Sequence, residues 1–342
     1  MLRGHRDTAR QGPVAQAVTG GATARRWAGP SWRRLLTGAV VASVLVLLVL
    51  AIALSPWEQV TIALAAANWG VLALALAASL VVYPLWVWQW RHIAAPLRIV
   101  RWPVMAQVVA LSIGARFTIS GLGGVASGGA ALHTHAGLTA AEAASVMTVD
   151  QILAGGTKLL VLVLALAMAP VPAPVRNASL VLGAALGVAC LLLAGLGRFR
   201  RALRSALGAR LGAAVARFAG DLGRLGSVRV VLPAALLAVL KKGLEIASAY
   251  AIQRALGIDG TPALAILAVA SVSLVSLLPL APVHLGPQAL AVFTTYAALG
   301  TPAAEAISVA VLHQAMMLVS TLIIGAAGLA VATCPARAKT TP

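Results

Sequence analysis

The chain has 342 residues, of which 61% are hydrophobic and only 10% are charged. Soluble domains carry about a quarter charged residues, so this composition excludes a water-soluble globular protein. The net charge of +18 does not indicate nucleic-acid binding, because the basic residues gather in a few segments between apolar stretches, as the positive-inside rule describes for membrane proteins.

Apolar stretches long enough to cross a bilayer recur along the chain. A hydrocarbon core about 30 Å thick requires about 20 apolar residues in a helix. Six stretches meet this length and predict full spans: 35–54, 66–88, 139–169, 178–197, 230–254 and 302–330. We therefore expect an all-α, polytopic integral membrane protein, in which a disordered basic tail (1–30) precedes a single helical domain (31–333) and a cytoplasmic tail (334–342).

Three further segments complete the predicted organisation. The stretches 104–136 and 262–299 are apolar but interrupted by glycine and proline, so each predicts a helix, a break and a second short helix. The segment 198–229 carries eight arginines and has apolar residues at helical spacing. It predicts an amphipathic helix on the cytoplasmic face, with a solvated basic loop as the alternative.

The two interrupted stretches belong to an internal repeat. When the sequence is displaced by 163 residues, 11 positions between 122 and 151 match their counterparts, including Leu122-Gly123 with Leu285-Gly286 and the run 140–143 with 303–306. Each copy has a break, a short helix, a glycine turn and then a long span. We take 104–169 as repeat A and 262–330 as repeat B.

The long spans of the two copies begin with different capping signals. Thr139 and Glu142 predict a capping box at the start of the repeat A span. Thr301-Pro302 instead predicts proline at the first helical position in repeat B. The turns before these spans are expected at Gly137 and Gly300.

The basic residues predict the orientation of the chain. Twenty of the 26 Lys and Arg residues lie in residues 3–34, in the C-terminal tail and in the segments 89–103 and 198–229. Placing these segments in the cytoplasm puts both termini inside and gives the two repeats opposite orientations. Inverted repeats with broken helices are common in transporters, although a scaffold that transports nothing can also arise by duplication.

The residues that form the repeat also resemble a known family. The similarity is carried by ISGLGGVASGGAALHTHAGLTAAEAASVMTVDQI, by LPLAPVHLGPQALAVFTTYAALGTPAAEAISVAVLHQ and by the stretch from Asn68 to Ile93, and it covers roughly residues 35–330. The chain resembles the transmembrane, flippase-like domain of lysylphosphatidylglycerol synthases. The resemblance implies a multi-pass protein of the bacterial inner membrane that translocates or handles an anionic or isoprenoid-type lipid.

The resemblance also limits what is expected of the chain. Full-length synthases carry a soluble aminoacyl-transfer domain that does not occur in this sequence, so we expect a stand-alone member that is not an enzyme. Many relatives have a proline before the first break and a glutamate after its glycine, where this chain has Ser120 and Gly124-Val125. In the second break Pro279, Pro282 and Gly286 match, but Gln288 stands in place of the usual glutamate. These departures argue against a mechanism that needs both carboxylates.

Ionisable residues inside predicted spans are the candidate functional residues, because a charge in the bilayer is costly. Asp150 lies 11 residues past the start of its span, about 16 Å along the helix and thus near the bilayer centre. Its counterpart in repeat B is His313. Lys158 lies farther along the same span, where its side chain can also snorkel to the interface.

A second group of charges lies in the middle of the span 230–254. Lys241, Lys242 and Glu245 can take part in transport, or Lys241 and Glu245 can form a structural ion pair at i,i+4 spacing. With Arg116, Lys158 and Asp150 the buried charges sum to +2, which favours an anionic headgroup.

The glycine-rich breaks are the second kind of candidate. We expect Gly123 and Gly286 to allow positive φ and close approach of a headgroup to the backbone, with tight helix packing as the alternative. The helix that follows each break presents its positive dipole end, which favours an anion. The candidate substrate path therefore comprises Arg116, Gly121, Gly123, Gly124, Asp150, Lys158, Lys241, Lys242, Glu245, Pro282, His284, Gly286, His313 and Gln314.

Other chemistries find little support in the sequence. His133 and His135 splay apart on a helix and have no carboxylate or cysteine beside them, so no metal and no other cofactor is expected. No strand precedes the glycine run 121–129, which excludes a dinucleotide fingerprint. We expect membrane lipids as partners, together with lipid-synthesis enzymes as possible ones, and no nucleic acid. A proton-coupled transporter using Asp150 or His313, and a scaffold for a lipid-modifying complex, are the alternative functions.

The topology can be tested with single cysteines. In a background without Cys190 and Cys334, cysteines placed at Ala173 and Gly208 should react with a membrane-impermeant thiol reagent from opposite faces, because the span 178–197 separates them. Labelling of both from the same face would contradict the inverted arrangement.

Overall fold

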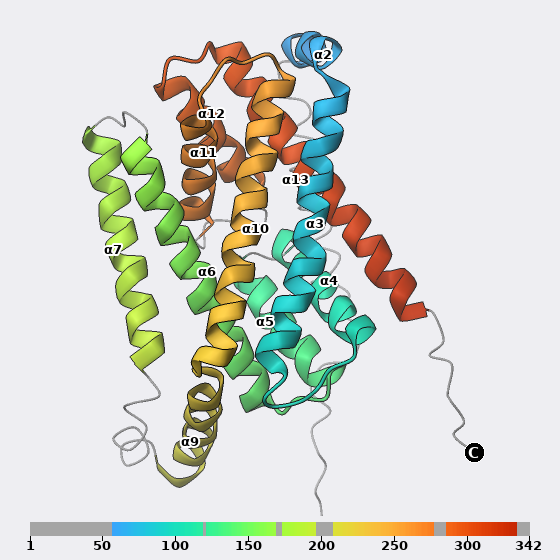
Figure 1. Cartoon of the computed structure of the whole chain (residues 1–342), viewed down its shortest axis with the longest axis vertical. Coiled ribbons are helices and arrows are strands. Elements are labelled where there is room, and N and C mark those ends of the chain that lie inside the picture. Colours follow the sequence, from blue (N-terminus) through green and yellow to red (C-terminus); the bar gives the residue numbers. More distant parts are fainter. Residues whose placement is uncertain (1–56, 119–120, 169–172, 196–207, 277–284, 334–342) are drawn as a thin grey trace, which may run out of the picture.

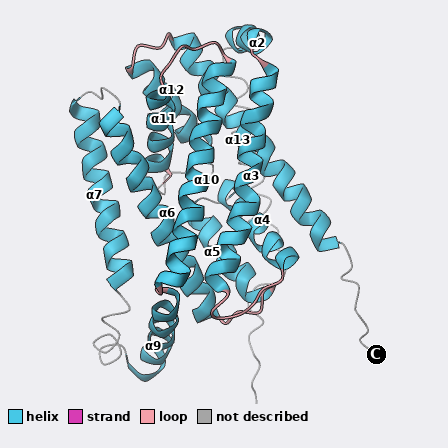
Figure 2. Ribbon diagram, in the orientation of Figure 1, coloured by secondary structure: helices cyan, strands magenta, loops and turns pink. Residues whose placement is uncertain are grey.

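The computed structural model describes residues 57–118, 121–168, 173–195, 208–276 and 285–333. Within these ranges every regular element is an α-helix and no strand occurs (Figure 2). The all-α prediction is therefore confirmed. The expected span 35–54 and the two expected tails lie outside the described residues, as does the first part of the basic segment 198–229.

The helices follow the predicted order along the chain. They are α2 (Trp57–Ala66), α3 (Trp69–Ala94), α4 (Trp102–Thr118), α5 (Gly121–Thr134), α6 (Ala140–Met168), α7 (Ala173–Gly195), α9 (Gly208–Leu225), α10 (Val228–Ala255), α11 (Pro262–Val275), α12 (Leu285–Ala298) and α13 (Ala303–Thr333). Figure 1 shows α3 and α10 side by side through the centre of the molecule. The α4–α5 hairpin lies toward the end occupied by α9, and the α11–α12 hairpin lies toward the opposite end, near α2.

Three of the described helices are long and apolar enough to cross a membrane: α3, α6 and the part of α13 from Ala303 to Gly328. Helix α10 has 28 residues, but Lys241, Lys242 and Glu245 interrupt its apolar sequence. Large apolar side chains are exposed on the outer surface of the helices, as expected where lipid replaces water. The chain is thus a multi-pass membrane protein, while the six full spans stay a prediction.

The two copies of the repeat have the same local structure. Helices α5 and α12 each contain 14 residues, and the turns that follow them contain Gly137 with φ 69° and Gly300 with φ 85°. Only glycine adopts this left-handed conformation without strain. Displacement by 163 residues also places the start of α6 on the start of α13, and most of α3 on α10. The order of helices thus matches one element farther toward the N-terminus than repeat A, while the repeat itself stays a prediction.

The capping box predicted for repeat A is confirmed. The Thr139 backbone N–H donates to Glu142 Oε2 at 2.8 Å, and the Glu142 N–H donates to Thr139 Oγ1 at 3.3 Å. In repeat B the structure differs by one residue from the prediction, because α13 begins at Ala303. Pro302 precedes this helix, and its carbonyl accepts the first helical bond, from Ala306 N at 2.9 Å.

Helix α9 is the described part of the basic segment 198–229, and it is amphipathic as expected. Leu222 and Leu225 are buried, whereas Arg217 and Arg224 are exposed. The helix packs against α6, where Ser145 Oγ donates to Phe218 O at 3.2 Å. One face of α9 is therefore anchored on the bundle and the other presents basic side chains.

Small residues allow close packing between α4 and α5. Ser112 Oγ donates to Gly124 O at 2.7 Å. A Cβ on Gly124 would lie 2.9 Å from Arg116 Cβ, and one on Gly128 would lie 2.7 Å from the Trp90 ring. The spacing of Gly124 and Gly128 is that of the small-xxx-small pattern that lets membrane helices approach.

This packing gives a test with a matched control. Gly128→Ala should lower the melting temperature of the detergent-solubilised protein, because overpacking of a tight contact costs about 1–3 kcal/mol. Gly129→Ala should be nearly neutral, since the added Cβ would lie 3.7 Å from Met147 Cγ, an ordinary contact. Equal melting temperatures for the two variants would contradict the described packing of α5 against Trp90 of α3 and Ser112 of α4.

Candidate functional site

Charged side chains from three helices meet in the interior of the bundle. Arg116 lies in the last turn of α4, Asp150 and Lys158 lie on α6, and Lys241, Lys242 and Glu245 lie on α10. Lys158 and Lys241 each interact electrostatically with the same four charges, which are Arg116, Asp150, Lys242 and Glu245. The structure thus brings together all six predicted charged residues, and we call them the central charge cluster.

Asp150 is the most deeply buried member, with 2% of its surface exposed. Its carboxylate accepts hydrogen bonds from Gln89 Nε2 at 3.4 Å and from Gln151 Nε2 at 3.1 Å. Among the described residues no cation forms a direct ion pair with it. Its charge acts on Arg116 and Lys241 at longer range.

The ion pair on α10 is not the predicted one. Lys242 Nζ, rather than Lys241 Nζ, pairs with Glu245 Oε2, at i,i+3 spacing. The prediction of a Lys241–Glu245 pair is therefore wrong. Residues at i,i+3 and at i,i+4 both lie on one helix face, so Glu245 could pair with either lysine. Lys242 is the partner because Lys241 makes its contact with another helix.

Lys241 lies against an aromatic ring from another helix. Its Nζ is 4.5 Å from the ring centroid of Trp86 on α3, and Arg116 Cζ is 4.9 Å from the same centroid. Trp90 meets Trp86 edge to face, with ring centroids 6.2 Å apart and an interplanar angle of 88°. Cation–π attraction stabilises both cations without neutralising them.

The end of α11 holds the other two lysines. Lys158 Nζ donates to Ser276 Oγ at 2.9 Å, and Lys242 Nζ lies 3.5 Å from Ser273 Oγ. Lys158 therefore turns into the bundle rather than snorkelling to an interface. Ser276 is the last described residue before the gap at 277–284, just as Arg116 lies shortly before the gap at 119–120.

Several buried polar atoms around the cluster have no hydrogen-bond partner among the described residues. They include Trp86 Nε1, Gln89 Oε1, Arg116 Nε, His313 Nδ1 and both amide atoms of Gln314. Buried polar atoms are normally satisfied, so this group is suited to bind polar atoms of a ligand. Glu245 interacts with Arg116, Lys241 and His313, and 43% of its side chain is accessible.

The glycines among the candidates have different roles. Gly123 and Gly286 lie inside α5 and α12, and the described glycines with positive φ are Gly137, Gly257 and Gly300. The expectation of positive φ at Gly123 and Gly286 is therefore wrong. Gly124 packs against Arg116 and so positions that side chain, whereas a Cβ on Gly286 would meet no atom within 4 Å.

The remaining candidates are placed as follows. His313 and Gln314 lie on α13, and Gly121 is the first residue of α5. Pro282 and His284 lie outside the described residues. In the described ranges no three His, Cys, Asp or Glu side chains gather as metal ligands, and His133 Nδ1 lies 2.7 Å from Leu138 O.

Sequence reasoning missed five residues that hold the cluster: Trp86, Gln89, Gln151, Ser273 and Ser276. A polar side chain inside an apolar span is the available signal, and it applies to the two glutamines and the two serines. Trp86 carries no such signal, because aromatic residues surround it in sequence.

A family model described as the lysylphosphatidylglycerol synthase TM region matches residues 35–325. The chain belongs to this family. The match spans the central charge cluster and both hairpins, so the lysylphosphatidylglycerol synthase TM region includes every element of the candidate site. No curated protein and no solved structure matches the chain.

The pairing on α10 can be tested by double-mutant cycles. The change in unfolding free energy for Lys242→Met combined with Glu245→Gln should depart from the sum of the single changes by about 0.5–1 kcal/mol. The same cycle for Lys241→Met with Glu245→Gln should show a smaller coupling, since Lys241 lies on Trp86. A larger coupling for Lys241 than for Lys242 would contradict this structure and favour the Lys241–Glu245 pair.

Proposed function

We propose that this protein is a flippase-like lipid transporter of the bacterial inner membrane, with both termini in the cytoplasm and without catalysis of a covalent reaction. The proposal rests above all on the central charge cluster. It places four cations and two carboxylates inside a membrane protein, and only Lys242 is directly paired with a carboxylate among them. The surplus positive charge suits the phosphate of an anionic or isoprenoid-type lipid.

The arrangement of the two hairpins supports a transport path through this cluster. The α4–α5 and α11–α12 hairpins lie toward opposite ends of the molecule (Figure 1), which fits the inverted repeat predicted from the charge distribution. Arg116 and Ser276 lie just before the two breaks. Arg116 rests on the ring of Trp86, and Ser276 accepts a hydrogen bond from Lys158 of the cluster. In inverted-repeat transporters substrate binds where the broken helices meet.

The chemistry of the cluster fits a phosphate-bearing headgroup. Arg116 and Lys241 rest on Trp86, and Arg116 Nε has no hydrogen-bond partner among the described residues. Guanidinium and ammonium groups bind phosphate through charge-assisted hydrogen bonds. The first turns of α5 and α12 follow the two breaks, and the positive end of each helix dipole favours an anion there.

A proton-coupled transporter of a small solute is the second candidate. Asp150 and His313 occupy matched positions in the two copies, and His313 interacts with the accessible Glu245. Such a chain of ionisable groups is a recurring proton path in membranes. We propose lipids, with lipid-synthesis enzymes as possible partners, rather than nucleic acid, since the basic segments suit anionic headgroups at the membrane surface.

Reconstitution in proteoliposomes tests the proposal. A fluorescent anionic phospholipid should become accessible to a membrane-impermeant quencher at a rate that Lys241→Met and Asp150→Asn each lower about tenfold or more, because each removes a charge from the cluster. Arg254→Gln is the matched control, since it removes an exposed cation from the end of the same helix, and it should leave the rate unchanged.

The controls separate the rival functions. Rates are normalised to the folded fraction measured by gel filtration. Normal rates per folded molecule for both cluster variants would make these residues structural. Proton flux into the vesicles without lipid movement would favour the small-solute transporter, and neither flux would favour a scaffold.

A further inference from the structure

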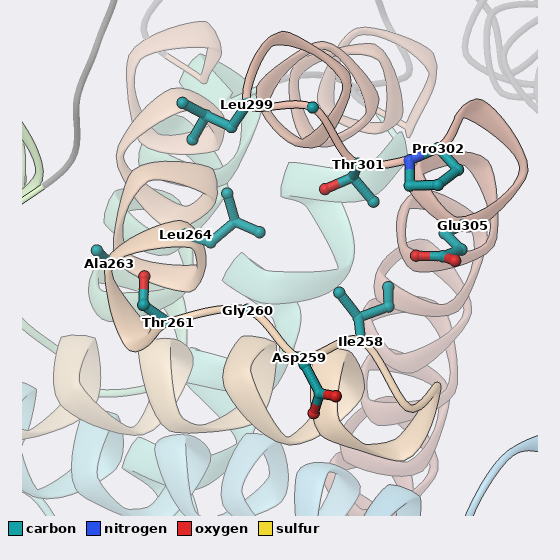
Figure 3. Close-up of a pocket in the computed structure, with 11 residues that line it drawn as sticks. Ile258, Asp259, Gly260, Thr261, Ala263, Leu264, Leu299, Thr301, Pro302 and Glu305 are labelled. Atoms are coloured by element: carbon teal, nitrogen blue, oxygen red, sulfur yellow. The ribbon is translucent and has the colours of Figure 1, made fainter.

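The end of the molecule opposite α9 contains a hollow that is separate from the central charge cluster. It has a volume of ≈ 340 Å³ and lies between residues 258–264, which join α10 to α11 and begin α11, and residues 299–305, which join α12 to α13 and begin α13 (Figure 3). We call it the end hollow. Its lining includes Asp259, Thr261, Gly300, Thr301 and Glu305, and contains no basic side chain.

Repeat A shows how this place is filled in the other copy. Displacement by 163 residues places Gly137 on Gly300 and Arg98 on Thr261. Arg98 Nη1 donates to Gly137 O at 2.6 Å, and the guanidinium atoms lie 3.0–3.4 Å from where a Cβ on Gly137 would stand. Around Gly300 no atom lies within 4 Å of that point. A guanidinium group thus covers the turn in repeat A, and none from the described residues covers it in repeat B.

A second difference between the copies leaves the carboxylate of Glu305 without its capping partner at the same place. Glu142 of repeat A corresponds to Glu305, and Thr139 corresponds to Pro302. Glu142 accepts from the Thr139 N–H and hydroxyl at 2.8 and 3.0 Å. Pro302 has neither an N–H nor a hydroxyl to donate, so Glu305 cannot close a capping box. Figure 3 shows its carboxylate beside the end hollow.

From these two differences we propose that the end hollow binds a guanidinium or primary ammonium group supplied by an external ligand. Gly300 O takes the part that Gly137 O has in repeat A, and Glu305 supplies the opposite charge. Asp259 is already paired with Arg254 Nη1 at 2.9 Å, so Glu305 is the carboxylate left to meet the cation.

The size of the hollow selects the kind of cation. A volume of ≈ 340 Å³ holds an organic group with its carbon chain, and the apolar side chains of Leu264 and Leu299 line part of the wall. A bare divalent cation would need several oxygen ligands within about 2.6 Å, whereas Glu305 is the single lining carboxylate not already paired with arginine among the described residues. The site goes beyond the proposed lipid transport, since it lies away from the central charge cluster.

The test uses the full chain in detergent and isothermal titration calorimetry with agmatine, a free guanidinium compound. We expect binding at one site per chain. Glu305→Gln should weaken it about tenfold, because a hydrogen bond to a charged partner is lost. Thr261→Arg should abolish it, because the new side chain fills the hollow as Arg98 covers Gly137. Glu58→Gln, an exposed change on α2 at the same end of the molecule, should leave it unchanged.

The outcomes decide both the proposal and the source of the cation. Agmatine binding without binding of the peptide Gly-Arg-Gly-amide assigns the hollow to a small organic cation, whereas tighter binding of the peptide assigns it to an arginine side chain of a partner. The proposal is overturned if neither probe binds. It is also overturned if agmatine still binds to a folded Thr261→Arg variant, or if calcium displaces agmatine as readily as another guanidinium compound does. Lipid transport by the wild-type protein is measured separately, so failure here leaves the transport proposal standing.

Discussion

Charged groups inside a membrane protein must find partners within the protein, because lipid chains offer none. Four cations and two carboxylates lie inside this bundle, and their burial costs free energy that direct ion pairs recover only for Lys242 and Glu245. The other charges depend on weaker partners: the face of Trp86, the hydroxyl of Ser276 and the amides of Gln89 and Gln151. The bundle therefore depends on an arrangement that brings these partners to the charges, and the helices involved are α3, α4, α6, α10 and α11.

Small residues make that arrangement possible. Gly124 and Gly128 bring α5 close to α4 and to Trp90, and the contact with Gly124 fixes the start of the Arg116 side chain. On the other side of the cluster, Ser79 Oγ and Ser248 Oγ lie 3.0 Å apart between α3 and α10. Close backbones replace the hydrophobic effect as the source of helix association in lipid, and they leave the long polar side chains to meet in the middle.

Length and periodicity predicted most of the elements. The spans expected at 139–169, 230–254 and 302–330 correspond to α6, α10 and α13 within a few residues, because their apolar runs end at clear turn and capping signals. The capping box at Thr139 and the turns at Gly137 and Gly300 could be predicted for the same reason. These features depend on neighbours in sequence, which a single chain displays.

Features that depend on neighbours in space could not be predicted in the same way. The choice of Lys242 over Lys241 as the partner of Glu245 follows from the position of Trp86 on another helix. The role of Gly124 likewise depends on the approach of α4. Spacing along a helix restricts the possible pairs, but the helices that pack beside it decide among them.

The most direct test of this account is a cryo-EM structure of the full chain in nanodiscs that contain an anionic phospholipid. The account predicts headgroup density between the two hairpins, with its phosphate in hydrogen-bonding range of Arg116 and Lys241. A structure in which the lipid stays outside the bundle, and Arg116 and Lys241 are closed into ion pairs with Asp150 and Glu245, would contradict it.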